Sequence, residues 1–128
     1  MRSTWKYGYD QLIHGCPIIT IGICDKQLTA LVDTGASQSS INPELAKLFN
    51  LTPTGRTVVM RTTELIECIE LYCDIEIFKG LTLHNRTIVA TSKNYEFILG
   101  MDILKDFNIN IQHTAQQVFV TLEYLYSV

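Results

Sequence analysis

The chain has 128 residues and a formal net charge of −3 at pH 7, and 47% of its residues are hydrophobic while 18% are charged. This length fits one domain, and the apolar content excludes an intrinsically disordered chain. The small negative charge gives no reason to expect nucleic acid binding, and no apolar run approaches the ~20 residues of a membrane-spanning helix. We therefore expect neither nucleic acid nor a membrane as a partner.

Residues 1–15, M-R-S-T-W-K-Y-G-Y-D-Q-L-I-H-G, are polar and aromatic without an apolar leader core, so they predict no secretory signal. We interpret them as an N-terminal arm before one domain over residues 16–128. The four cysteines form no C-x-x-C motif and the three histidines are scattered, which argues against a zinc site. We expect reduced thiols in an intracellular, non-secreted protein, with no metal and no other cofactor.

The first half of the domain predicts a β-hairpin and a short helix. Apolar and β-branched residues indicate strands over 17–23 and 28–32, joined by the turn Cys-Asp-Lys-Gln. Asn42 is a favourable N-cap, and Pro43 follows at the first helical position, where the missing N–H of proline costs nothing. We therefore expect a helix over 42–49.

The second half predicts further strands and one short helix. The signal over 57–78 is β, and apolar and polar residues alternate most clearly at 74–77. The remaining expected elements are strands over about 82–90, 97–100, 108–111 and 118–125, and a helix over 101–107. Many short strands with two short helices favour a closed or sandwich-like β fold.

An acidic residue follows directly after an apolar strand in the stretch A-L-V-D-T-G-A-S, residues 30–37. An acid is costly to bury alone, and D-T-G by itself is an ordinary turn sequence because Asp and Gly both favour turns. The context strengthens the signal, because a second apolar strand, F-I-L-G at 97–100, also ends at a glycine and leads into a helix. Asp33 is therefore the candidate chemical group.

With these segments the chain resembles the retropepsin family, the aspartic proteases of retroviruses and retroelements. The matching segments, which occur in the family's order, are P-I-I-T-I-G at 17–22, A-L-V-D-T-G-A-S at 30–37, N-P-E-L-A-K-L-F at 42–49 and F-I-L-G-M-D-I-L at 97–104. The residues around I-L-G-M-D are most similar to those of proteases from gypsy-type LTR retrotransposons and plant pararetroviruses. The resemblance spans about residues 16–125 and implies a mainly β, closed barrel-like fold with one or two short helices.

The resemblance also implies the active form and the reaction. Retropepsins carry one D-T-G per chain, as here, and act as homodimers, so two Asp33 side chains would meet on a twofold axis. Two carboxylates about 3 Å apart share one proton. The ionised acid activates a water that attacks the peptide carbonyl, and the protonated acid stabilises the oxyanion. This implies an aspartic endopeptidase that processes a viral or retroelement polyprotein, in the host cytoplasm or a virus-like particle.

The resemblance assigns roles to the residues around Asp33. The hydroxyl of Thr34 would reach across the axis and lock the two catalytic loops together, and Gly35 would let its N–H approach the acid. The residues that would line or support the substrate cleft are Ala36, Ser37, Ile98 and Leu99. Gly100 would permit the second turn, and Asp102 would either make a further polar contact or favour the helix N-terminus.

One segment departs from the family pattern. Retropepsins cover the cleft with a hairpin, the flap, whose tip usually carries glycine, and the matching segment has no glycine between Gly55 and Gly80. Glycine normally supplies the positive φ angles of tight hairpin turns. The tip near Thr62, Thr63 and Glu64, where we expect substrate contacts, therefore has a longer turn or a different shape.

The two ends of the chain are candidates for the dimer contact, since the termini of retroviral members interleave into a sheet. The C-terminal stretch V-F-V-T-L-E-Y-L-Y-S-V fits such a strand, whereas the N-terminal W-K-Y-G-Y-D-Q-L-I is aromatic without a clear strand pattern. Ordinary edge packing or disorder is the alternative for both ends.

Two other functions are compatible with the sequence. A non-catalytic retropepsin-fold domain for dimerisation or peptide binding would fit the missing flap glycine, but it would not need the intact D-T-G. A cellular retropepsin-like protease of the ubiquitin-shuttle kind would carry the same motifs, although we find no ubiquitin-like or ubiquitin-binding segment in the sequence. We favour the enzyme that processes a polyprotein.

Overall fold

Strands account for most of the computed structural model, which describes residues 1–61 and 64–126. In chain order the strands are β1 (Arg2–Gly8), β2 (Ile18–Ile23), β3 (Lys26–Val32), β4 (Ser40–Ile41), β5 (Pro53–Arg61), β6 (Leu65–Phe78), β7 (Leu81–Ala90), β8 (Phe97–Leu99), β9 (Phe107–His113) and β10 (Gln117–Tyr124). The helices are the 3-10 helix η1 (Tyr9–Gln11), α1 (Pro43–Leu48) and α2 (Met101–Leu104).

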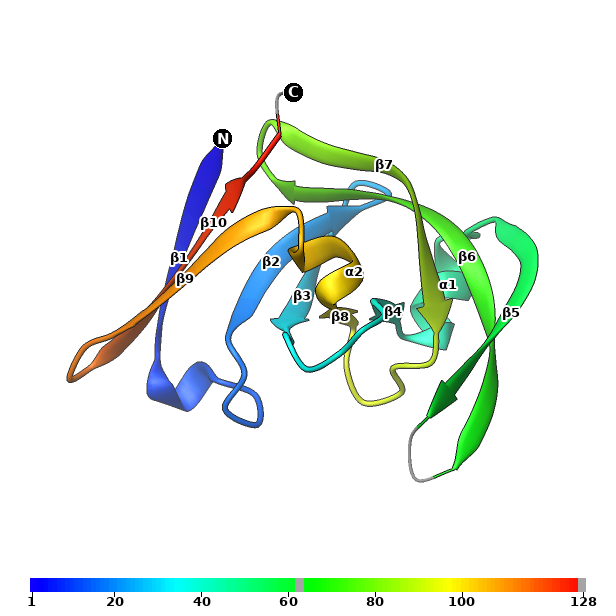
Figure 1. Cartoon of the computed structure of the whole chain (residues 1–128), viewed down its shortest axis with the longest axis horizontal. Helices are drawn as coiled ribbons and strands as arrows, with labels where there is room; N and C mark the ends of the chain where they lie inside the picture. Colours follow the sequence, from blue (N-terminus) through cyan, green and yellow to red (C-terminus); the bar gives the residue numbers. More distant parts are fainter. Residues whose placement is uncertain (62–63, 127–128) are drawn as a thin grey trace.

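Two sheets are formed (Figure 1). The larger sheet has the strand order β2-β3-β8-β4-β7-β6-β5, and an additional pairing between β2 and β6 closes it into a barrel with β5 outside the ring. The smaller sheet has the order β1-β10-β9. The expected mainly β, closed barrel-like fold with two short helices is therefore confirmed.

Local sequence explains the predicted hairpin and helix. Cys24 and Asp25 form the two-residue turn between β2 and β3, with φ angles of 51° and 61°. Positive φ at both turn residues matches the twist of the flanking strands. At the start of α1, the Asn42 side chain accepts a hydrogen bond from the Glu44 N–H (2.8 Å), and Pro43 is the first helical residue. The predicted N-cap is confirmed.

Alternate residues of the strands fill the barrel. The inward positions of β2 and β6 carry isoleucine, and Ile21, Ile23, Ile75 and Ile77 are at most 2% exposed. Burial of each such side chain contributes roughly 1.5–3 kcal/mol. Phe97, which is 0% exposed, brings β8 into the same core. This core fixes the strands that carry the candidate site.

The N-terminal residues form a strand that the sequence did not clearly indicate. β1 pairs antiparallel with β10 along its whole length. Tyr7 is 8% exposed, and its hydroxyl accepts a hydrogen bond from the Ile18 N–H (3.0 Å) at the start of β2. Trp5 packs against Phe78 at the end of β6, with ring centroids 6.2 Å apart. These two aromatic side chains attach the smaller sheet to the barrel.

The second helix is shorter than predicted. We expected it over 101–107, but α2 ends at Leu104 and β9 begins at Phe107. Between them, Asp106 is buried and forms an ion pair with Arg86 on β7 (3.0 Å), a contact between distant segments that the local pattern does not contain. No helix within residues 1–61 and 64–126 has the length and apolar character needed to cross a lipid bilayer.

Tyr7 should make the stability of the protein sensitive to alkaline pH. Burial raises its pKa from 10.0 to about 12, so its contribution to stability is complete below pH 10 and is lost as the pH rises toward 12. At neutral pH, Tyr7→Phe should lower the free energy of unfolding by about 1 to 2 kcal/mol, because the Ile18 N–H loses its acceptor. In urea unfolding experiments, this difference should shrink between pH 10 and 12.

The control for this experiment is Tyr9→Phe, because Tyr9 is 43% exposed. It should change the free energy of unfolding less than Tyr7→Phe at neutral pH. A difference between wild type and Tyr7→Phe that stays constant into the alkaline range would contradict the role assigned to Tyr7.

Candidate active site

Asp33 lies where β3 ends, directly after the buried residues Leu31 and Val32. Its backbone N–H donates to the Leu99 carbonyl of β8 (3.0 Å), which continues the parallel pairing of these two strands. In Figure 1, β3 and β8 lie near the middle of the molecule, and the chain continues from β3 through a loop to β4. The candidate acid is therefore positioned by two barrel strands.

Gly35 brings the backbone of the turn against the acid. Its N–H donates to Asp33 Oδ1 (2.9 Å), and a Cβ at this position would lie 3.2 Å from the same oxygen. The Ala36 N–H closes the turn on the Asp33 carbonyl (3.2 Å). Asp33 is half-buried, whereas Thr34 and Gly35 are exposed. The close approach that we expected of the Gly35 N–H is present, and both residues beside the acid face outward.

Asp102 ties the loop after Asp33 to the segment after β8. Its Oδ1 accepts hydrogen bonds from the Ser39 N–H (3.0 Å) and the Ser39 hydroxyl (2.7 Å). The Ser39 hydroxyl in turn accepts one from the Gly100 N–H (2.9 Å), and Ser39 is 0% exposed. Asp102 thus makes a polar contact with the Ser39 loop. It also lies at the helix N-terminus, where its Oδ1 accepts a hydrogen bond from the Ile103 N–H in the first turn of α2 (3.0 Å).

Gly100 allows the two loops to touch. The Met101 N–H donates to the Ala36 carbonyl (2.7 Å). A Cβ on Gly100 would lie 2.8 Å from the Gln38 carbonyl carbon and 2.9 Å from the Ala36 carbonyl oxygen. Both are backbone atoms of the loop after Asp33, so any side chain at this position would push that loop away. Glycine is needed at position 100 because the backbone of the loop after Asp33 approaches it closely.

The register of the sheet places Asp33 on a face that continues toward the β5–β6 hairpin. Laterally paired residues share a face of a sheet, and successive residues alternate between faces. The row of laterally paired residues on this face, from β3 across to β6, is Leu31, Ile98, Ser40, Val89 and Glu70. Asp33 is two positions after Leu31 and is therefore directed to the same side.

The hairpin continues this face. Ile66 and Cys68 alternate with Glu70 along β6, and their partners on β5 are Met60 and Val58. All four are apolar, and each is buried or half-buried except Ile66, which is 37% exposed. The hairpin projects from the barrel beyond α1 (Figure 1). The segment matched to the flap is thus a hairpin whose apolar inner face adjoins the face of Asp33.

Of the three residues predicted at the hairpin tip, the structure describes only Glu64. Thr62 and Thr63 lie outside the described residues, and Glu64 is exposed. Gly55 has a φ of +88°, but it lies in β5 at the base of the hairpin. The positive φ of Gly55 therefore shapes the backbone at the base of the hairpin.

The other predicted cleft residues differ in exposure. Ile98 is half-buried on the face of Asp33, Ala36 is half-buried and Ser37 is exposed. Leu99 is 0% exposed and belongs to the barrel core, so it supports the site from behind.

Cys16 is a neighbour of Asp33 that we did not predict. The Pro17 carbonyl accepts a hydrogen bond from the Val32 N–H (2.8 Å), which brings Cys16 to the end of β3. Burial raises the pKa of the Cys16 thiol, and the nearby Asp33 carboxylate raises it further because it disfavours a second negative charge. The β2–β3 hairpin could have indicated this neighbour. Ile18 pairs with Leu31, and continuing this antiparallel register by two residues places Cys16 opposite Asp33.

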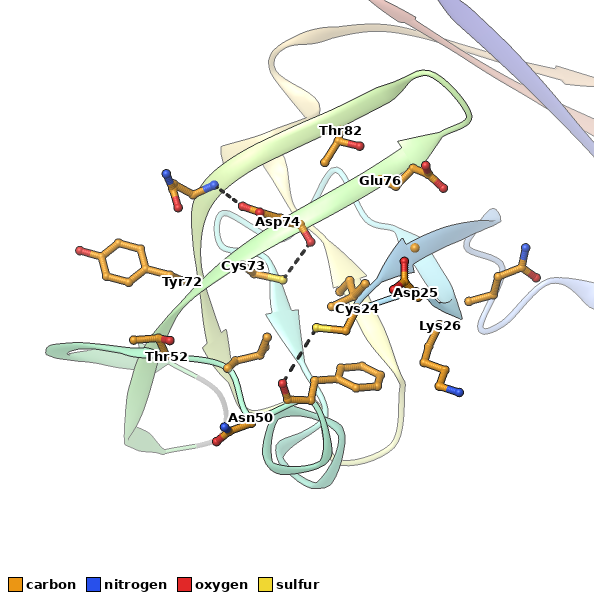
Figure 2. A pocket seen from close by; sticks show the side chains of 16 residues that line it. Cys24, Asp25, Lys26, Asn50, Thr52, Tyr72, Cys73, Asp74, Glu76 and Thr82 are labelled. Atoms are coloured by element: carbon orange, nitrogen blue, oxygen red, sulfur yellow. Dashed lines mark hydrogen bonds between the residues drawn. The ribbon is translucent and has the colours of Figure 1, made fainter.

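A hollow of about 700 Å³ lies elsewhere on the barrel, and none of the predicted site residues lines it (Figure 2). Its walls include Cys24 in the β2–β3 turn and Cys73 and Asp74 on β6. Burial raises the pKa of Cys73 to about 12, with smaller contributions from Cys24 and Asp74. Within the described residues, no group of three or more His, Cys, Asp or Glu side chains is placed to hold a metal ion. This hollow is therefore separate from the candidate site around Asp33.

A closed β-barrel with one D-T-G turn, braced by a glycine turn from a second strand, defines a retropepsin-like domain. Residues 19–106 match the model of the family described as "gag-polyprotein putative aspartyl protease". The chain belongs to this family of aspartic proteases. Among curated proteins, no sequence matches the chain significantly.

Solved structures show the same fold. A retropepsin-like aspartic protease from Rickettsia conorii is 16% identical with a TM-score of 0.63, and the match covers 94% of this chain and 92% of that chain. EIAV protease, in complex with the inhibitor HBY-793, is 24% identical with a TM-score of 0.55, over 71% of this chain and 86% of that chain. The retroviral protease-like domain of Ddi1 from Leishmania major is 16% identical with a TM-score of 0.52, over 74% and 79%.

The hydrogen bonds to Asp102 should carry a measurable part of the stability. Asp102→Ala should lower the free energy of unfolding by about 2 to 3 kcal/mol, because the buried N–H and hydroxyl of Ser39 lose a charged acceptor. The matched control is Asp74→Ala, which removes a carboxylate that accepts the Asn85 N–H (2.7 Å) but is 58% exposed. The control should cost less than about 1 kcal/mol in urea unfolding. Equal losses would contradict a special role for Asp102.

Proposed function

We propose that the protein is an aspartic endopeptidase and that its active form is a homodimer with one Asp33 from each chain. Membership of the family suggests peptidase activity. The observation that carries the proposal is the placement of Asp33 at a strand end, between the Leu99 carbonyl and the Gly35 N–H, on the face that continues into the β5–β6 hairpin. The sequence contains one D-T-G, and we assign the second carboxylate to a second copy of the chain.

The reaction needs one proton shared by two acids and one water. In each chain Asp33 Oδ1 accepts the Gly35 N–H, and we assign Oδ2 to the water and the partner acid. The ionised acid takes a proton from the water, the water oxygen attacks the peptide carbonyl, and the neutral acid donates to the developing oxyanion. A proton then passes to the amide nitrogen, the C–N bond breaks and the amine leaves. Each chain contributes the same carboxylate, and no covalent intermediate with the protein forms.

The substrate is an extended peptide with apolar side chains around the cut. On the face that Asp33 shares with the hairpin, the structure offers apolar side chains at Ile98, Met60 and Ile66, and the small residue Ala36 follows in the Asp33 turn. An extended peptide can pair with such a site through its main chain, while alternate side chains enter pockets. The family description supports a viral or retroelement polyprotein as the natural substrate, and we place its processing inside the cell.

The dimer contact would use sheet edges other than the C-terminal strand. This strand was one candidate for the contact, with ordinary packing as the alternative, and β10 is paired within the chain on both sides, with β1 and with β9. In the part of the chain that the structure describes, the outer edges of this sheet belong to β1 and β9. Ile111 on β9 is 39% exposed and offers an apolar contact beside such an edge. Thr34, which is exposed next to Asp33, would meet its counterpart at the axis.

Asp33→Asn should abolish peptide cleavage, with a loss of about a thousandfold or more, because the amide cannot act as the base. The fold should be retained, since the Asn side-chain oxygen can still accept the Gly35 N–H. The measurement is the digestion of a peptide library at mildly acidic pH, with products identified by mass spectrometry. The matched control is Asp25→Asn, which changes an exposed acid in the β2–β3 turn and should cleave like wild type.

Retained cleavage by Asp33→Asn would refute the proposed function. If neither protein cleaves at high concentration while wild type binds extended peptides, the non-catalytic peptide-binding domain becomes the better description.

Activity should depend on protein concentration because the dyad exists only in the dimer. Below the dissociation constant of the dimer, activity per chain should fall in proportion to concentration. The measurement is specific activity over a dilution series, compared with sedimentation velocity of the same samples. Constant specific activity across a range in which sedimentation shows dissociation would contradict a shared site.

A further inference from the structure

The long strand β6 changes its pairing partners at Glu70, and we call this position the joint. From Glu70 onward, β6 pairs with β7 inside the barrel. Before Glu70, among the described residues, β6 pairs with β5 alone. The paired residues 57–61 and 65–69 therefore form a two-stranded ribbon that extends beyond the barrel, as the green hairpin in Figure 1 shows. The direction of this ribbon is decided at the joint.

A β-bulge lies opposite this joint. Pro53 pairs with Leu71 and Thr57 pairs with Ile69, so the three residues 54–56 on β5 face Glu70 alone. Gly55, the middle residue of the bulge, has a φ of +88°. Bulges bend the strand that contains them and increase its twist. The bulge thus bends the ribbon where it leaves the barrel.

The Glu70 side chain holds the bulge in this shape. Glu70 is 7% exposed, and its Oε1 accepts a hydrogen bond from the Thr54 hydroxyl (2.9 Å). The Thr54 Oγ1 accepts one from the Arg56 N–H (3.1 Å), and the Arg56 Nε lies 3.8 Å from Glu70 Oε1. The Arg56 side chain is 77% exposed, so this long ion pair contributes little. The partly buried hydrogen bond between Glu70 and Thr54 is the main constraint.

We propose that Glu70 is a positioning residue that sets the direction of the hairpin relative to Asp33. Glu70 is the last member of the row that crosses the sheet from Leu31, and it adjoins the inner hairpin positions Cys68 and Ile66 on the same face. Without its carboxylate the bulge can relax, and the inner face of the ribbon turns away from the Asp33 side. The proposal rests on the proposed function for its effect on substrate, but the effect on the ribbon itself does not.

The chain offers a matched control in the same hairpin. Glu67 Oε1 accepts a hydrogen bond from the Thr57 hydroxyl (2.9 Å), which is the same chemistry between β5 and β6. Glu67 lies on the outer face of the ribbon and is exposed, and its hydrogen-bond partner Thr57 is the first β5 residue that is paired after the bulge. Glu67→Ala therefore removes an equivalent Thr–Glu bond without touching the joint.

The first measurement is amide hydrogen exchange of the free protein. Glu70→Ala and Thr54→Val should each accelerate exchange in the ribbon about tenfold, while exchange in β2, β3 and β8 stays unchanged. Glu70→Gln keeps an acceptor for the Thr54 hydroxyl and should resemble wild type. Unchanged ribbon exchange in both Thr54→Val and Glu70→Ala would overturn the proposal, and so would an equal acceleration in Glu67→Ala. If Glu70→Ala does not fold, Thr54→Val decides alone.

The second measurement is the kinetics of cleavage of an extended peptide found in the library digestion. Glu70→Ala should raise KM about tenfold and change kcat less than about threefold, because substrate loses the hairpin wall while the dyad is intact. A fall in kcat at unchanged KM would overturn the positioning role. If wild type cleaves no peptide, the proposed function fails, whereas hydrogen exchange still decides whether Glu70 positions the hairpin.

Discussion

The hydrogen bonds between the Asp102 carboxylate and Ser39 are the constraint on which the site depends. They join the loop that follows Asp33 to the helix that follows β8. Gly100 permits this contact, because the backbone atoms of the loop occupy the space of its missing side chain. The strands β3 and β8 position the acid itself, and this polar contact between two halves of the chain holds the loop that follows it, supported by the apolar core behind Leu99. A satisfied buried network of this kind specifies one arrangement of the loops.

The sequence was sufficient for the features that local patterns determine. The strand that leads into Asp33, the capped start of α1 and the apolar alternation of β6 were all predicted, because each depends on neighbours in the chain. The residues that hold the site were not found in this way. Ser39 looked like one polar residue in a polar loop, and its role appears only when Asp102 is brought beside it from 63 positions away. The two-residue strand β4 was missed because two residues show no period.

The hairpin shows how a family pattern can be kept with a different local solution. We expected the missing tip glycine to change the flap, and the strands of the hairpin form regardless of it. The glycine lies in a bulge at the base, where positive φ bends the strand, and a glutamate closes the bulge. No short motif would have located this, because a bulge is defined by the register of two strands and not by the residues of one.

The pairing of β1 with β10 has a consequence for how the proposed dimer would form. Each chain completes its smaller sheet with its own N-terminal strand and attaches it to its own barrel through Tyr7 and Trp5. For the proposed dimer, folding and association would therefore be two separate equilibria, in contrast to proteins whose monomers fold only on pairing. Dilution would then separate the protomers without unfolding them, and the carboxylate of Asp33 would be intact in each. The proposed enzyme would then be switched on by its own local concentration and would be silent as a dispersed single chain.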